Sequence, residues 1–101
     1  MRRGNFRRAL SLAFRRTPRG PLRTVMLYET QGCGLCAETF RQLSRVALDT
    51  AIEIVRVDIA TDPALFQRYG LRVPVVATDG RELDASGVSE SALRAFVAAS
   101  R

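Results

Sequence analysis

The stretch Gln31-Gly32-Cys33-Gly34-Leu35-Cys36 holds both cysteines of this 101-residue chain. It follows an apolar run, residues 24–28, that is typical of a buried strand, and it precedes a run with apolar residues at helical spacing. A thiol at such a junction faces the unpaired N–H groups and the positive dipole end of the helix, which lowers the pKa of the thiol. The position predicts a redox pair in which Cys33 attacks a disulfide and Cys36 resolves the product.

Composition narrows the class of protein. The chain has a mass of 11.2 kDa, 47% hydrophobic residues and 26% charged residues, which is typical of one small globular domain. It contains no histidine, which excludes Cys-His catalysis and His-ligated metal sites. Two neighbouring cysteines do not form the framework of a secreted disulfide scaffold, which favours a cytoplasmic protein whose cysteines have a catalytic or a metal-binding role. Of these two roles we expect the catalytic one, without a metal or other cofactor.

The positive charge is concentrated at the N-terminus. Residues 1–23 hold eight arginines and no acid, whereas residues 24–101 hold eight arginines and ten acids. We therefore expect a basic extension over 1–23, with a short amphipathic helix over 5–16, and one folded domain over 24–101. The alternatives for the extension are contact with an anionic membrane surface and an arm without function. Nucleic-acid binding is not expected, because the extension lacks interleaved aromatic residues with a defined groove.

The hydrophobic pattern predicts an α/β domain. The expected elements are a strand over 24–28, a helix beginning near Cys36, a strand over 52–59, a helix over 64–69, a strand over 71–77, a strand over 81–84 and a helix after Ser89. Asp62 and Pro63 suit the N-cap and first position of a helix, and Gly70 is expected to end that helix in a left-handed conformation. Asp79-Gly80 predicts a two-residue hairpin turn. The strand–helix–strand start requires parallel pairing, so the sheet is expected to be mixed.

With this order of elements, the chain resembles the thioredoxin superfamily and, within it, the small bacterial glutaredoxin-like proteins. The resemblance covers about residues 24–98 and rests on Leu27-Tyr28, Gly32-Cys33-Gly34-Leu35-Cys36, Val57-Asp58-Ile59, Tyr69-Gly70-Leu71-Arg72-Val73-Pro74-Val75 and Asp79-Gly80. It implies a glutaredoxin-type thioredoxin-like fold of four strands flanked by helices. It also implies a cis Val73–Pro74 bond, packing of Pro74 beside Cys33, and pairing of the Val73 backbone with an extended substrate. The expected substrate-binding residues are Gly34, Leu35, Arg72, Val73 and Pro74.

Some positions depart from the glutaredoxin pattern. Thr30 stands where glutaredoxins usually carry a lysine that meets a glutathione carboxylate, and residues 84–87 replace their Gly-Gly followed by an acid or serine. Arg72 is either a compensating cation or a solvated charge. Three acids, namely Glu29, Asp58 and Asp84, are either proton relays for the second thiol or exposed carboxylates at strand ends.

The expected function is thiol-disulfide oxidoreduction by Cys33 and Cys36. Its expected partner is a disulfide-containing protein or a low-molecular-weight thiol, with glutathione as one candidate reductant. Two alternatives remain at this point. The first is a metal or iron–sulfur carrier in which two chains pool their cysteines, because two thiols cannot complete a four-ligand site. The second is a partner-binding module with an inert cysteine pair.

Overall fold

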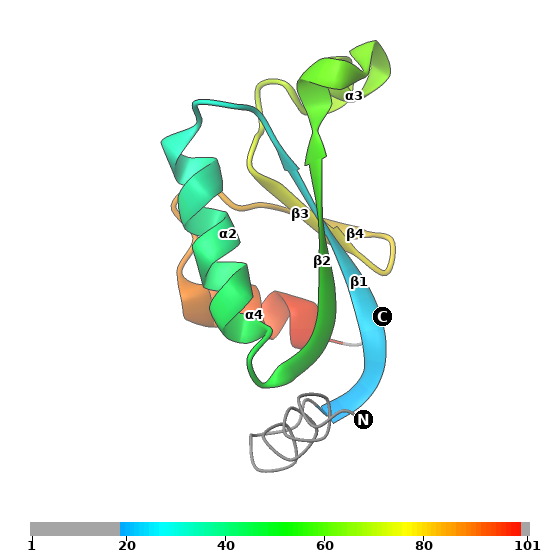
Figure 1. Cartoon of the computed structure of the whole chain (residues 1–101), viewed down its shortest axis with the longest axis vertical. Helices are drawn as coiled ribbons and strands as arrows, with labels where there is room; N and C mark the ends of the chain where they lie inside the picture. The colour runs from blue at the N-terminus through cyan, green and yellow to red at the C-terminus, as the bar shows by residue number, and fades with distance from the viewer. Residues whose placement is uncertain (1–18, 100–101) are drawn as a thin grey trace, which may run out of the picture.

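A computed structural model of the chain describes residues 19–99 as a four-stranded mixed sheet with helices on both faces (Figure 1). In chain order the elements are β1 (Arg19–Glu29), α2 (Gly34–Val46), β2 (Thr50–Asp58), the 3-10 turn η1 (Ile59–Thr61), α3 (Pro63–Tyr69), β3 (Val75–Thr78), β4 (Arg81–Asp84) and α4 (Glu90–Ala98). The strands lie in the order β2-β1-β3-β4, with β1 parallel to β2 and the other two pairs antiparallel. The predicted α/β order and the mixed sheet are confirmed. No helix within residues 19–99 is long and apolar enough to cross a membrane.

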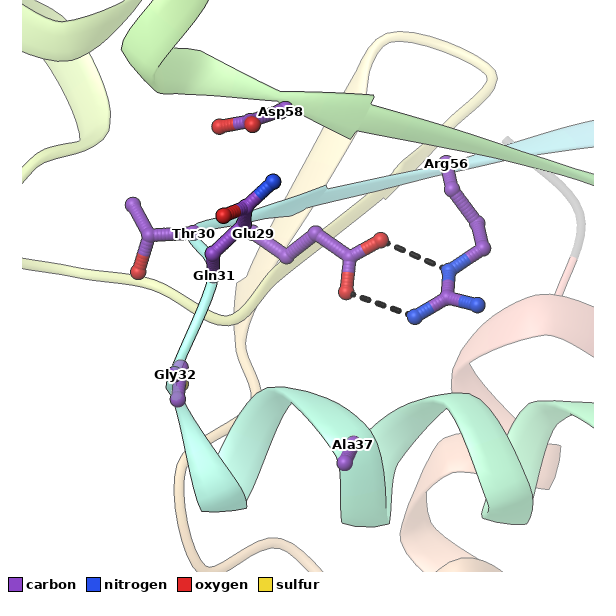
Figure 2. A pocket seen from close by; sticks show the side chains of 8 residues that line it. Glu29, Thr30, Gln31, Gly32, Ala37, Arg56 and Asp58 are labelled. Atoms are coloured by element: carbon purple, nitrogen blue, oxygen red, sulfur yellow. Dashed lines mark hydrogen bonds and ion pairs between the residues drawn. The ribbon is translucent and has the colours of Figure 1, made fainter.

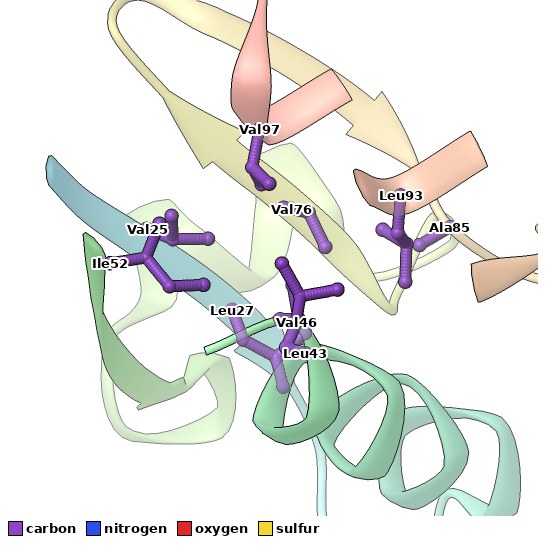
Figure 3. Packing of buried hydrophobic residues seen from close by; sticks show 9 residues of the cluster. All are labelled: Val25, Leu27, Leu43, Val46, Ile52, Val76, Ala85, Leu93 and Val97. Carbon is purple, nitrogen blue, oxygen red and sulfur yellow. The ribbon is translucent and has the colours of Figure 1, made fainter. Parts of the chain in front are cut away.

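The main core lies between one face of the sheet and helices α2 and α4, as Figure 3 shows. Its buried members are Val25, Leu27, Leu43, Val46, Ile52, Val76, Ala85, Leu93 and Val97. The buried residues of α2 recur every three or four positions, which is the spacing of one helix face. Cys36 lies on this same face, so packing of α2 against the sheet fixes the position of the cysteine pair.

A smaller core lies on the opposite face of the sheet. Val75 points to this face while its neighbour Val76 joins the main core, as alternation along a strand requires. Val75 packs there with Ile59 and with Tyr69 at the end of α3. The Tyr69 ring stacks on Tyr28 of β1, with 4.2 Å between the ring centroids. These contacts attach α3, and the loop that follows it, to the sheet.

Strand β1 begins five residues before the predicted start at Thr24. Its register against β2 shifts between Arg19 and Arg23, where four steps along β1 match two steps along β2. Pro21 lies in this shift, because a proline cannot donate to the ladder. Residues 19–23 therefore extend the strand, although their sequence was read as part of the extension. The predicted helix over 5–16 lies outside the described residues.

Helix α3 begins and ends at the predicted residues, but Gly70, which ends it, differs in conformation. The Asp62 side chain accepts a hydrogen bond of 2.9 Å from the Ala64 N–H, and Pro63 is the first helical residue. The prediction of a left-handed Gly70 was wrong, because its φ is −55°. A Cβ at Gly70 would lie 2.5 Å from the Phe66 carbonyl oxygen, so close backbone approach, rather than an unusual φ, requires glycine there.

The strand predicted over 71–77 is shorter in the structure and begins at Val75. The N–H groups of Arg72 and Val73 both donate to the Tyr69 carbonyl, at 2.8 and 3.1 Å, which curls this segment into a turn. The Val73–Pro74 peptide bond that follows is cis. The predicted hairpin turn at Asp79-Gly80 is confirmed, and both of its residues have positive φ.

A charged cluster joins α3 and the turn after it to β4. The Glu82 carboxylate accepts hydrogen bonds from the Tyr69 hydroxyl at 2.7 Å, Arg72 at 2.9 Å and Arg68 at 3.0 Å. These hydrogen bonds, that of Tyr69 first, lower the pKa of Glu82 to about 2. Burial, followed by the hydrogen bond to Glu82, raises the pKa of Tyr69 to about 12. The cluster therefore favours an ionised Glu82 and a neutral Tyr69.

We expect acid to weaken this cluster. The pKa of Glu82 is about 2 in the folded chain against an ordinary value of 4.5, so its contribution is complete above pH 4.5 and is lost as the pH falls toward 2. The Glu82→Gln variant should therefore lose less stability than the wild type over this range, as measured by urea unfolding midpoints at successive pH values.

The matched control is Glu38→Gln, which removes an exposed carboxylate that pairs with Arg41 on the surface of α2. This variant should keep the wild-type acid dependence. A Glu82→Gln curve parallel to the wild-type curve would contradict the assignment.

Candidate active site at the Cys33–Cys36 pair

Cys33 and Cys36 lie at the start of α2 and form a disulfide, with 5.2 Å between their Cα atoms. Cys33 is the N-cap of α2 in an extended conformation, and the helix proper begins at Gly34. The preceding Gly32 has a φ of +75°, a conformation that favours glycine, where the chain turns from β1 into the helix. The sequence expectation of a cysteine pair at a strand-to-helix junction is confirmed.

The two cysteines differ in exposure. Cys36 is 1% exposed on the core face of α2, whereas Cys33 is half-buried. The Cys36 backbone N–H donates a hydrogen bond of 3.0 Å to the Cys33 Sγ, which in the reduced protein stands for the thiol or thiolate sulfur. A donor at this position stabilises negative charge on that sulfur. Gly34 and Leu35 between the cysteines are both exposed.

Both residues of the cis Val73–Pro74 bond make backbone hydrogen bonds to other parts of the chain. Pro74 is buried, and its carbonyl accepts a hydrogen bond of 2.8 Å from the Ala85 N–H. The Val73 N–H already donates to Tyr69, so a substrate strand would meet a Val73 backbone whose donor is engaged. Contact of Val73 and Pro74 with substrate stays a prediction, as does packing of Pro74 beside Cys33.

Arg72 forms ion pairs with two carboxylates, so it is neither a free cation nor a charge that meets only solvent. Its guanidinium donates to the Asp84 carboxylate at 2.8 Å and to Glu82 at 2.9 Å, and these two hydrogen bonds raise the pKa of Arg72. Two carboxylates therefore offset its charge, which limits what it can offer an anionic ligand. Its role in substrate binding stays a prediction.

A pocket of about 310 Å³ opens beside Cys33 (Figure 2). Its walls come from the ends of β1 and β2, the loop before α2 and the first turn of that helix. The lining residues are Glu29, Thr30, Gln31, Gly32, Cys33, Ala37, Arg56 and Asp58. The structure thus brings two of the three candidate acids together beside the cysteine that sequence analysis chose as nucleophile.

An ion pair between neighbouring strands forms one wall of the pocket. Arg56 of β2 donates to both Glu29 oxygens, at 2.7 and 3.1 Å, and lies over the Phe40 ring at 3.9 Å from its centroid. Sequence analysis missed this pair. The parallel register of β1 and β2 is the feature that indicates it. In this register Glu29 lies opposite Asp58, and Arg56 lies two residues before Asp58 on the same strand.

The three candidate acids have different surroundings. Glu29 is bound to Arg56, and Asp84 is bound to Arg72. Asp58 instead caps η1, where its Oδ1 accepts a hydrogen bond of 2.9 Å from the Ala60 N–H. A proton-relay role for any of them stays a prediction. Residues 19–99 contain no group of three or more His, Cys, Asp or Glu side chains arranged to hold a metal ion.

We expect the reduced protein to be alkylated much faster at Cys33 than at Cys36, because Cys36 is 1% exposed and Cys33 is accessible from the pocket. The measurement is a time course with iodoacetamide, followed by peptide mass mapping. Full denaturation is the control and should equalise the two rates. Equal rates in the native protein would contradict the assigned order of accessibility.

The chain is similar to known proteins in sequence and in fold. The family model for a glutaredoxin-like domain (DUF836) matches residues 24–98. Among curated relatives, uncharacterized protein Rv0508 of Mycobacterium tuberculosis is 32% identical over 81 residues, which cover 75% of this chain and 84% of that protein. Uncharacterized protein Mb0520 of Mycobacterium bovis matches with the same identity and coverage.

Solved structures agree with the family match. The X-ray structure of target protein XcR50 from X. campestris has a TM-score of 0.67 and 36% identity, covering 76% of this chain and 99% of that one. A mutant thioredoxin from Halobacterium salinarum has a TM-score of 0.58 and 24% identity, covering 74% and 71%. The second likeness concerns the fold alone. By its sequence match, its strand order and its cysteine pair, the chain belongs to the glutaredoxin-like (DUF836) family and has a thioredoxin-like fold.

Proposed function

We propose that this protein is a thiol-disulfide oxidoreductase in which Cys33 is the nucleophile and Cys36 is the resolving cysteine. The observation that carries the proposal is the geometry of the pair. The half-buried Cys33 caps the helix and accepts a hydrogen bond from a backbone N–H, while the buried Cys36 lies within disulfide-bonding distance. The family match supports the same chemistry.

The reaction runs in two exchange steps. The Cys33 thiolate attacks one sulfur of the substrate disulfide, the substrate S–S bond breaks, and one substrate thiolate leaves and takes up a proton. The Cys36 thiolate then attacks the Cys33 sulfur, forms the Cys33–Cys36 disulfide and releases the second substrate thiolate. Two electrons pass from the dithiol to the substrate, and an external thiol must later reduce the protein again.

The burial of Cys36 favours this function over the metal-carrier alternative. A cluster shared by two chains would need both sulfurs of each chain at the interface, because each chain supplies two of the four ligands. With Cys36 at 1% exposure on the core face of α2, one of those two sulfurs is turned away from any partner chain. Attack on the neighbouring Cys33 sulfur requires no such exposure.

The first test is the redox equilibrium of the pair. Samples are equilibrated in buffers of reduced and oxidised glutathione, quenched with acid, and their oxidation states read by mass. We expect a reduction potential of about −200 to −270 mV, the range of glutaredoxins and thioredoxin. A pair that forms no disulfide in any of the buffers would overturn the proposal.

Variants separate the two roles. The Cys36→Ser variant should accumulate a mixed disulfide between Cys33 and the substrate, because the step that releases the product is blocked. The Cys33→Ser variant should reduce bis(2-hydroxyethyl) disulfide no faster than the buffer control, because the remaining thiol is buried. Equal activity of Cys33→Ser and the wild type would show that Cys33 is not the nucleophile.

A further inference from the structure

We propose that the pocket beside Cys33 is a substrate subsite that favours disulfides carrying a positive charge near the reactive sulfurs, with Asp58 as the residue that determines this preference. The inference rests on the proposed function and adds a substrate class to it. Three observations support it: the position of the pocket, the pairing of the charges around it, and the pairing of Arg72 with two carboxylates.

The position of the pocket makes it relevant to the reaction. Cys33 forms part of its wall, together with the end of β2 and the loop before α2. Attack joins the Cys33 sulfur to one half of the substrate, so the atoms next to the substrate sulfur must lie close to this wall. A volume of about 310 Å³ admits a small side chain or the end of a small thiol.

The charges around the pocket do not cancel. Two carboxylates, Glu29 and Asp58, face one guanidinium, Arg56, which leaves a formal charge of −1. The guanidinium binds Glu29 through two hydrogen bonds, so that carboxylate is already satisfied. Asp58 keeps an uncompensated charge, because only its Oδ1 is engaged, by a neutral N–H. Within residues 19–99, no hydrogen bond or ion pair engages its Oδ2.

The remaining polar lining is uncharged, and Arg72, the cation that the sequence offered for ligand binding, is paired elsewhere. Thr30 and Gln31 supply a hydroxyl and an amide to the pocket. Arg72, beside the Val73–Pro74 turn, is paired with both Glu82 and Asp84. An ammonium or guanidinium on the substrate would thus meet the open Asp58 oxygen, whereas a carboxylate would meet repulsion.

The net charge of the chain does not decide this preference. The positive excess lies in residues 1–23, whereas residues 24–101 hold eight arginines and ten acids, a balance of −2. Two variants that each remove one carboxylate change the net charge equally, so a difference between them comes from the pocket and not from the overall charge.

The experiment uses the full chain with Cys36→Ser, which isolates attack by Cys33. Rate constants are measured for three small disulfides: the cationic cystamine, the neutral bis(2-hydroxyethyl) disulfide and the anionic 3,3′-dithiodipropionate. The readout is the ratio of the cystamine rate to the dithiodipropionate rate, divided by the same ratio for free 2-mercaptoethanol. A change in the thiolate fraction of Cys33 affects all three probes equally, so it cancels in this ratio.

We expect a normalised ratio above one, and a fall of about threefold in the Asp58→Asn variant, the size typical of one partly exposed charge pair. Asparagine keeps the cap on η1 and removes only the charge. High salt should reduce the wild-type ratio toward one.

The matched control is Asp62→Asn. Asp62 caps α3 through the Ala64 N–H at 2.9 Å, the same distance as the Asp58 cap, but it does not line the pocket. Its substitution should leave the ratio unchanged.

Three results would overturn the inference: a normalised ratio of one or below in the wild type, no change in Asp58→Asn, or equal falls in both variants. In each of these cases the neutral disulfide still reacts at Cys33, so the proposed function stands. Failure of all three disulfides to react at Cys33 would overturn the proposed function together with the inference.

Discussion

The packing of one face of α2 against the sheet is the constraint on which the rest of the site depends. Leu43 and Val46 are fully buried on that face, and burial of such side chains contributes about 1.5–3 kcal/mol each. Cys36 lies on the same face, so the force that docks the helix also buries the second thiol. Cys33, three residues earlier, is then left half-buried at the helix N-terminus, where its sulfur accepts a hydrogen bond from a backbone N–H.

A second constraint holds the segment with the cis bond. Strand β4 contributes Glu82 and Asp84, and Arg72 bridges them. Tyr69 joins the same carboxylate at 2.7 Å and stacks on Tyr28 of β1. The turn before β3 is thus attached to two strands. The positive charge of Arg72, which the sequence offered for ligand binding, is instead paired with carboxylates of β4. One arginine cannot serve both purposes at full strength, because a carboxylate from the substrate would compete with two that are already in place.

Of the three charged side chains in the pocket beside Cys33, Glu29 and Arg56 neutralise each other, and Asp58 has no cationic partner within residues 19–99. The pair is bidentate and lies against Phe40, so its charges largely cancel for a nearby ligand. The carboxylate of Asp58, two residues beyond Arg56, accepts a hydrogen bond only from a neutral N–H. Under the proposed function, such neighbouring charges are the features that can distinguish one substrate disulfide from another.

Elements whose causes are local could be predicted from the sequence alone. The Asp62-Pro63 helix start, the Asp79-Gly80 turn and the cysteine pair at a strand-to-helix junction follow from the chemistry of adjacent residues. Tertiary structure decided what depends on partners distant in the chain. Gly70 was misassigned because its constraint is a close approach to Phe66, not a φ preference. The pairing of Arg56 with Glu29 depends on the register of two parallel strands, which no single stretch of sequence encodes. Local patterns therefore placed the cysteine pair, and the packing of distant segments placed the charges around it.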